Sequence, residues 1–190
     1  MEEHNNITSP YNDMQTIKRR FFAMRNGVVA DTLRRAGSPF HIIFGLNLPQ
    51  IVEIASEIPE TQREAMADAL WQNRSTRESM LIAPMLMPPK DTDYACAIRM
   101  MHESPCAEVA DILCHRLLRH TPFALRLARE CAEDKDEKVR YAALRLMFNL
   151  VADNAQESMD MARSELDRNC AYTRKIAAAL LDEADFMLNP

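Results

Sequence analysis

The sequence predicts an all-α protein, on the evidence of its composition, its helical periodicity and its regular helix-start signals. The chain has 190 residues, with 10 prolines, only 3 glycines and 6% aromatic residues, a balance that suits short helices and disfavours a β-rich core. Its 47% apolar and 27% charged residues are typical of a globular domain. We expect a frayed segment at residues 1–10 and a single helical-repeat domain over residues 11–190.

The clearest helical pattern lies at residues 134–152, DKDEKVRYAALRLMFNLVA. Its apolar residues share one helix face, and Ala142 and Ala143 at the centre would let a second helix approach closely. Asp134 is placed to cap its start. Similar segments begin at Arg63, Arg77 and Arg174. The Asp, the Val-Arg pair and the Ala-Ala pair resemble half of a HEAT repeat, so we expect a right-handed α-α superhelix, a HEAT- or armadillo-like solenoid.

Turn and cap residues divide the chain into about eleven helices. The first follows Ser9-Pro10, a second short helix stops at Gly37, and Gly45 turns the bulky segment before a helix that begins near Leu48. The remaining helices are expected over residues 61–72, 76–87, 92–103, 105–119, 122–133, 136–152, 155–168 and 171–188.

Two of these helix starts fit the capping box, in which a hydroxyl and a carboxylate three residues later satisfy each other's backbone amides. The pairs are Thr61 with Glu64 and Ser75 with Glu78. Both predictions concern local hydrogen bonds, so the structure can test them directly.

The charge balance restricts where nucleic acid could bind. A net charge of -5 gives no overall attraction to phosphate, so binding needs a local basic surface. The best phosphate candidates are two pairs that each share a helix face across a predicted hairpin: Arg116 with Arg119, and Arg126 with Arg129. A solvated face offset by nearby acids is the alternative. The N-terminal helices are also locally basic, with Lys18, Arg19, Arg20, Arg25, Arg34 and Arg35.

Cofactor, metal and export signals are weak or missing in the sequence. The five cysteines have no C-x-x-C spacing and are expected to be reduced core residues of a cytoplasmic protein. We expect no cofactor, because neither G-x-x-x-x-G-K nor G-x-S-x-G occurs. No metal is expected either, because Asp111 and His115 share a helix face from which Cys114 points away. No apolar run approaches the ~20 residues that span a bilayer, so no membrane partner is expected.

The stretch from Phe44 to Pro89, FGLNLPQIVEIASEIPETQREAMADALWQNRSTRESMLIAPMLMPP, resembles the early part of the bacterial HEAT-like DNA alkylation-repair glycosylases. A Gly-containing corner before a proline, a Leu-Trp pair and a helix rich in leucine and methionine carry the resemblance, which extends from about Met14 to the C-terminus. It implies a protein that holds duplex DNA in a concave basic groove and releases alkylated purines without flipping the base. Trp71 itself we interpret as a core anchor.

The resemblance also implies a catalytic carboxylate. In the family an Asp follows a Trp by four residues; here Asp111 matches the Asp, and Ala107 stands where the Trp is expected. An alkylated purine is already a cationic leaving group, so a carboxylate that stabilises the oxocarbenium-like sugar is the main chemical requirement. An Asp in the first turns of a helix also favours the helix dipole, which is the structural alternative for Asp111.

The other family residues are matched only in part. Arg140 matches an arginine of the family, although an Arg after Val also belongs to the structural repeat. In the last helix Arg174 and Lys175 match an Arg-Lys pair of the family and are expected to contact DNA, but Ala178 and Ala179 follow where a second Trp is expected. The two tryptophans that the family resemblance implies are therefore both absent at the expected positions.

Three functions remain open. The preferred hypothesis is a diverged member that binds duplex DNA, undamaged or damaged, with weak or absent glycosylase activity. The second is an active alkylpurine glycosylase that uses Asp111 with aromatic help from Tyr94, Tyr141 or Tyr172. The third is a non-enzymatic scaffold whose partner is another protein.

Overall fold

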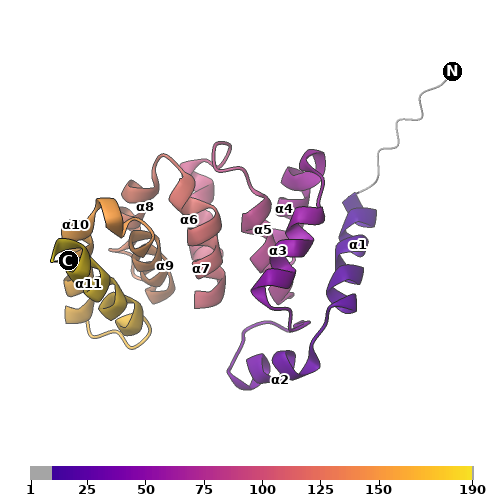
Figure 1. The fold of residues 1–190 in the computed structure, drawn as a ribbon, viewed down its shortest axis with the longest axis horizontal. Helices are drawn as coiled ribbons and strands as arrows, with labels where there is room; N and C mark the ends of the chain where they lie inside the picture. Colours follow the sequence, from indigo (N-terminus) through magenta and orange to yellow (C-terminus); the bar gives the residue numbers. More distant parts are fainter. Residues whose placement is uncertain (1–9, 190) are drawn as a thin grey trace. The chain divides into compact units, whose positions relative to one another are not determined.

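The computed structural model describes residues 10–189, which form a helical structure (Figure 1). The described residues contain eleven α-helices and no named strand; an isolated bridge joins Ile42 to Thr76. The α-helices are α1 (Pro10–Ala23), α2 (Gly27–Arg35), α3 (Leu48–Glu57), α4 (Arg63–Gln72), α5 (Arg77–Leu86), α6 (Tyr94–Glu103), α7 (Ala107–Arg116), α8 (Ala124–Cys131), α9 (Glu137–Phe148), α10 (Ala155–Asp167) and α11 (Arg174–Leu188). Sequence neighbours pack in pairs, notably α4 with α5, α8 with α9 and α10 with α11. The predicted all-α solenoid of about eleven helices is confirmed.

The chain divides into two compact units, Met1–Met87 and Pro88–Pro190, and each has its own buried apolar core. The single domain expected over residues 11–190 stays a prediction. Of the segment expected to be frayed, only Pro10 lies within the described residues, where it begins α1; the rest lies outside them. Among residues 10–189, no helix combines the length and the apolar content needed to cross a bilayer.

The core of the first unit forms around α4 and α5. Trp71 of α4 is 2% exposed, which confirms its predicted role as a core anchor. Phe21 of α1 and Leu46 of the corner before α3 are both fully buried in the same unit. Burial of large apolar side chains such as these stabilises the unit.

A buried glutamate fixes the corner that precedes α3. The carboxylate of Glu78 is fully buried and accepts the backbone N–H groups of Phe44, Gly45 and Leu46 at 3.1, 3.0 and 3.4 Å. The capping box predicted for Ser75 with Glu78 is therefore wrong, and α5 begins without a side-chain cap. The Glu78 carboxylate satisfies buried amides of the corner, which would be costly to leave without a partner, and the Arg77 N–H at the start of α5 donates to the carbonyl oxygen of Ile42 instead.

Two other predicted helix starts also differ from the structure. The capping box of Thr61 with Glu64 is wrong: a 3₁₀ turn, η1 (Glu60–Gln62), leads into α4, which has no side-chain cap. Asp136, not Asp134, caps α9; Asp134 accepts the N–H of Asp136 at 2.8 Å and so shapes the turn before the helix. Shifts of this size are normal at helix ends.

Helix α9 is the centre of the second unit, where it packs against α6, α7, α8, α10 and α11. Ala142 and Ala143 are fully buried, and the thiol of Cys114 in α7 lies 3.3 Å from the carbonyl oxygen of Ala142. This close approach confirms the role predicted for the small side chains. The strip of α9 that stays partly exposed carries Tyr141, Arg145 and Phe148, which are spaced at i, i+4 and i+7.

We expect Gly45→Ala to destabilise the first unit by about 2 kcal/mol or more. Gly45 has φ +80°, and an added Cβ would lie 2.2 Å from the carbonyl oxygen of Asn26. Gly27→Ala is the matched control, because a Cβ there meets no atom within 4 Å. Urea unfolding followed by Trp71 fluorescence measures both variants, since this buried residue is the chain's one tryptophan. Equal stability of the two variants would contradict this account of the corner.

Candidate functional site

Helix α7 places Asp111 at the edge of the second unit. Val109, Ala110, Leu113 and Cys114 form the buried face of this helix. Asp111 lies beside that face, and its side chain is 35% exposed. The carboxylate is thus anchored by a buried helix yet remains accessible from solvent.

Two side chains from α9 reach this carboxylate. The hydroxyl of Tyr141 donates a hydrogen bond to Asp111 Oδ1 at 3.0 Å. The Nε of Arg145 lies 3.2 Å from the same oxygen, but the pair lacks hydrogen-bond geometry and Nε has no hydrogen-bond partner among the described residues. Because Tyr141 and Arg145 are four residues apart, one helix face delivers both groups.

A second tyrosine extends the site. The rings of Tyr141 and Tyr172 meet edge to face, with their centroids 5.5 Å apart and their planes at 66°. Tyr172 precedes α11 and also hydrogen-bonds to the backbone of Ala107, the first residue of α7. Two aromatic rings therefore lie near Asp111, although neither comes from a position where the family resemblance implies tryptophan.

Burial sets the protonation behaviour of this cluster. It raises the pKa of Asp111, while the charge of Arg145 and the hydrogen bond from Tyr141 act in the opposite direction. The pKa of Tyr141 is also raised, first by burial and then by the adjacent Asp111 charge. Tyr141 therefore acts as a hydrogen-bond donor to an acceptor carboxylate.

The structure gives Arg140 a different environment. It is 9% exposed, and its Nε lies 3.1 Å from both carboxylate oxygens of Glu165 in α10. Its Nη1 donates to the carbonyl oxygens of Asp134 and Lys135 at 3.0 and 3.1 Å. Thr173 donates to Glu165 at 2.6 Å, which completes a buried network. The structure brings Arg145, not Arg140, to Asp111.

Arg145 is a site residue that the sequence did not predict. The Val-Arg pair of the repeat pattern predicted Arg140 instead, and the structure places Arg140 against Glu165. The available signal was spacing: Arg145 lies on the same helix face as Tyr141, away from the buried Ala142 and Ala143. An arginine on the exposed strip of a core helix is a better candidate for a ligand contact than one in its buried face.

The basic residues predicted to contact phosphate differ in whether their side chains already pair with other groups of the protein. Arg116 and Lys175 are exposed, and neither pairs with a carboxylate within residues 10–189. Arg119 lies 3.2 Å from the Nδ1 of His115. Arg174 hydrogen-bonds to Asn169. Their contact with DNA stays a prediction.

Arg126 and Arg129 are already paired with acids. Arg126 donates to Glu130 at 2.8 Å and lies over the ring of Tyr94, 4.3 Å from its centroid. Tyr94 donates its hydroxyl to Glu130, so the structure places this tyrosine in the α6–α8 contact and not at Asp111. DNA would have to displace these acids before either arginine could bind phosphate.

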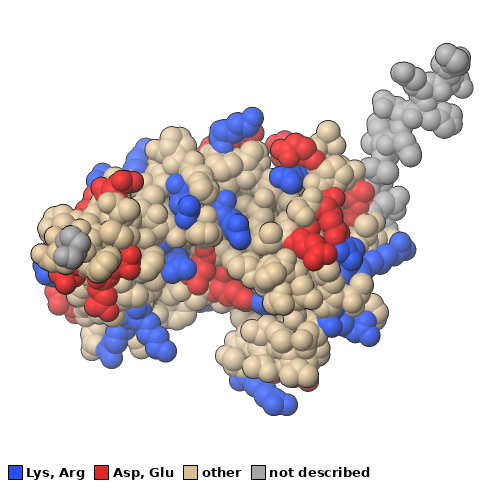
Figure 2. All heavy atoms as spheres, in the orientation of Figure 1, with Lys and Arg blue, Asp and Glu red and all other residues tan. Residues whose placement is uncertain are grey.

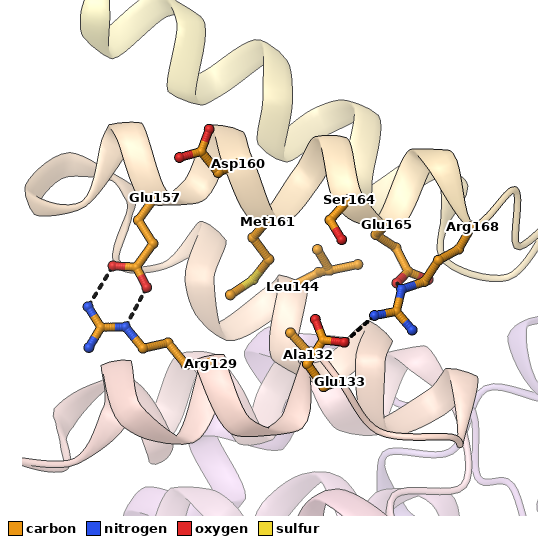
Figure 3. A pocket seen from close by; sticks show the side chains of 10 residues that line it. All are labelled: Arg129, Ala132, Glu133, Leu144, Glu157, Asp160, Met161, Ser164, Glu165 and Arg168. Atoms are coloured by element: carbon orange, nitrogen blue, oxygen red, sulfur yellow. Dashed lines mark hydrogen bonds and ion pairs between the residues drawn. The ribbon is translucent and has the colours of Figure 1, made fainter.

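Arg129 belongs to the rim of a separate cavity between α8, α9 and α10 (Figure 3). The cavity has a volume of about 220 Å³, and Ala132, Leu144 and Met161 form its apolar part. Figure 3 shows the ion pair of Arg129 with Glu157 at one end and that of Arg168 with Glu133 at the other. The first pair joins α8 to α10, and the second joins the turn after α8 to the residue that follows α10.

The described residues offer no cluster of three or more His, Cys, Asp or Glu side chains that could hold a metal ion. The cysteines are free thiols, and Cys114 and Cys131 are buried. Burial raises the pKa of Cys131 to about 11, so this thiol stays protonated near neutral pH. The chemistry available at the site is that of a carboxylate, a guanidinium and two phenols.

We expect Arg145→Ala to raise the pKa of Asp111 further, because it removes the positive charge that opposes the effect of burial. Carbon-13 NMR titration of the carboxyl groups measures this pKa, and Asp111→Asn assigns the signal. Arg116→Ala is the control, since Arg116 is an exposed arginine of α7, the helix that carries Asp111. An Asp111 pKa that is the same in the wild type and in Arg145→Ala would show that the pair is not formed in solution.

Comparison with known proteins identifies the family. The model of the family described as DNA alkylation repair enzyme matches residues 17–189, which is most of the chain. No curated protein and no solved structure matches the chain. The resemblance stated from the sequence is thus confirmed, and the match supports a role related to DNA repair. The chain is a diverged member of the DNA alkylation repair enzyme family.

Proposed function

We propose that the protein binds duplex DNA that contains a cationic alkylated purine, and that it releases the base slowly at Asp111. The observation that carries this proposal is the partly exposed Asp111 carboxylate beside the rings of Tyr141 and Tyr172. Membership of the DNA alkylation repair enzyme family supports it.

The chemistry needs little more than this cluster. An N3- or N7-alkylpurine leaves as a neutral base, so the developing positive charge falls on the sugar. In its ionised form Asp111 stabilises that charge and orients the attacking water. Electron-rich ring faces stabilise a neighbouring cation, and Tyr141 and Tyr172 supply two such rings.

Arg145 competes with a cationic nucleotide for the Asp111 carboxylate. In the free protein it neutralises Asp111, so a cationic nucleotide has to compete with the guanidinium for the carboxylate. The two side chains of this ion pair are about one third exposed and lack hydrogen-bond geometry, so the pair is weak enough to exchange. Arg145 then turns to a phosphate of the bound strand, and Asp111 is left facing the lesion.

Turnover is expected to be slow for a structural reason. Ala107, Ala178 and Ala179 offer no ring at the positions where the family resemblance implies tryptophan. The two tyrosines meet edge to face with each other, so part of their surface is unavailable for the nucleotide. Loss of a stacking face costs about 1–3 kcal/mol by analogy with bases stacked on aromatic residues.

Base release from duplex DNA containing N7-methylguanine tests this function. We expect Asp111→Asn to slow release at least about tenfold, towards the spontaneous rate, because the stabilising charge is lost. Tyr141→Phe keeps the ring and removes only the hydrogen bond to Asp111, so its effect should be smaller. Tyr94→Phe is the matched control, because the Tyr94 hydroxyl binds Glu130 instead.

The pH dependence follows from the raised pKa of Asp111. The ionised form is active, so release attributable to Asp111 should fall on acidification at a higher pH than an ordinary aspartate would give. Subtraction of the Asp111→Asn rate removes the spontaneous reaction at each pH.

If wild type and Asp111→Asn release base equally, yet lesion duplex still binds more tightly than undamaged duplex, the protein is a lesion binder only. If no duplex binds even at low salt, the proposal fails and a protein-binding scaffold is favoured.

A further inference from the structure

The first unit carries a basic surface that the Asp111 site does not use. Residues 14–46 contain six basic side chains and a single acid, Asp31, in a chain whose net charge is -5. Two of the six are paired within the unit: Arg20 with Glu53 and Glu57, and Arg34 with Asp31. Basic atoms reach the surface along the lower part of α1 and at α2 (Figure 2).

Part of this basic surface is a defined patch on α1 and the turn that follows it, made of Lys18, Arg19, Phe22 and Arg25. The opposite face of α1 is buried through Ile17 and Phe21, so the geometry of the helix turns the patch outward. Lys18 and Arg19 are exposed, and neither pairs with a carboxylate within residues 10–189. We call this group the α1 patch.

An exposed aromatic ring lies in the middle of the α1 patch. Phe22 is 58% exposed, and the guanidinium of Arg25 covers part of its ring, 3.8 Å from the centroid. Arg25 also donates to the carbonyl oxygen of Phe22 at 3.0 Å, which fixes the two side chains relative to each other. Phe22 and Phe44 line a shallow hollow of about 520 Å³ that Lys18 and Arg19 flank.

We propose that the α1 patch binds single-stranded nucleic acid, with a base stacked on Phe22 and phosphates held by Lys18, Arg19 and Arg25. Sequence-tolerant single-strand sites combine free cations with aromatic platforms in this way. A duplex hides its base faces, so the exposed ring of Phe22 would gain nothing from it except at an end. This site lies in the first unit, and it goes beyond the lesion contacts proposed around Asp111.

The patch fits a nucleic-acid strand better than a lipid surface. A helix that lies on a membrane inserts a broad apolar face, whereas the apolar face of α1 is buried in the protein. The patch offers one aromatic ring for a base and three cations for the neighbouring phosphates, which is the alternation of groups along a single strand. Binding to anionic vesicles is therefore an outcome that would count against the proposal.

Fluorescence anisotropy of the full chain with a labelled oligo(dT) of about twelve nucleotides tests the site. Phe22→Ala and Phe22→Leu should both weaken binding by about fivefold or more, since neither offers a ring face. Phe22→Trp should restore it. Lys18→Ala with Arg19→Ala should reduce the slope of log K against log salt by about 1.4, because a single strand contributes ~0.7 for each phosphate neutralised.

The matched control is the double variant Lys90→Ala with Arg163→Ala, which removes one lysine and one arginine that are exposed outside the patch. Its salt slope should equal that of the wild type. Asp111→Asn should bind oligo(dT) normally, so failure of the lesion site and failure of the α1 patch are distinguishable. Wild-type affinity in Phe22→Ala and in the Lys18/Arg19 variant overturns the proposal. The proposal is also overturned if the protein binds phosphatidylserine vesicles in a way that depends on Phe22 and does not bind oligo(dT).

Discussion

The burial of α9 is the constraint on which the second unit and its site depend. Five helices pack around α9, and Ala142 and Ala143 make that close packing possible. What remains accessible is one narrow strip, from which Tyr141 and Arg145 reach the Asp111 carboxylate of α7. The position of the candidate site is therefore a consequence of core packing, because α9 has no other accessible strip to offer a ligand.

Two arginines of α9 show how burial determines whether an ion pair stabilises the fold or can open for a ligand. Arg140 and Glu165 are buried together, and three further acceptor and donor groups complete their hydrogen bonds. Breaking such a pair typically costs about 3–5 kcal/mol, so it serves the fold. Arg145 and Asp111 are about one third exposed, and exposed pairs contribute at most about 1 kcal/mol. Only this second pair can open for a ligand at little cost.

Local sequence patterns predicted the helices well and the partners of polar side chains less well. The apolar periodicity around Ala142 identified α9, and the resemblance pointed to Asp111, which the structure places in an accessible cluster. Glu78 was misread because its partners lie 32–34 residues away along the chain, where no cap pattern can reach. The sequence named Tyr94, Tyr141 and Tyr172 as alternatives beside Asp111 but could not choose between them, since the place of Tyr172 depends on how α11 packs against α9.

Whether a lesion binds beside Asp111 is tested most directly by NMR of the tyrosine rings, recorded while duplex DNA with a cationic abasic-site mimic is added. The chain has four tyrosines, which makes the spectrum simple to assign by substitution. If the lesion binds beside Asp111, the ring signals of Tyr141 and Tyr172 shift at saturation, the signal of Tyr94 stays unchanged, and undamaged duplex has a weaker effect. Tight binding that leaves Tyr141 and Tyr172 unshifted would contradict this binding site, because the lesion would then lie elsewhere on the protein.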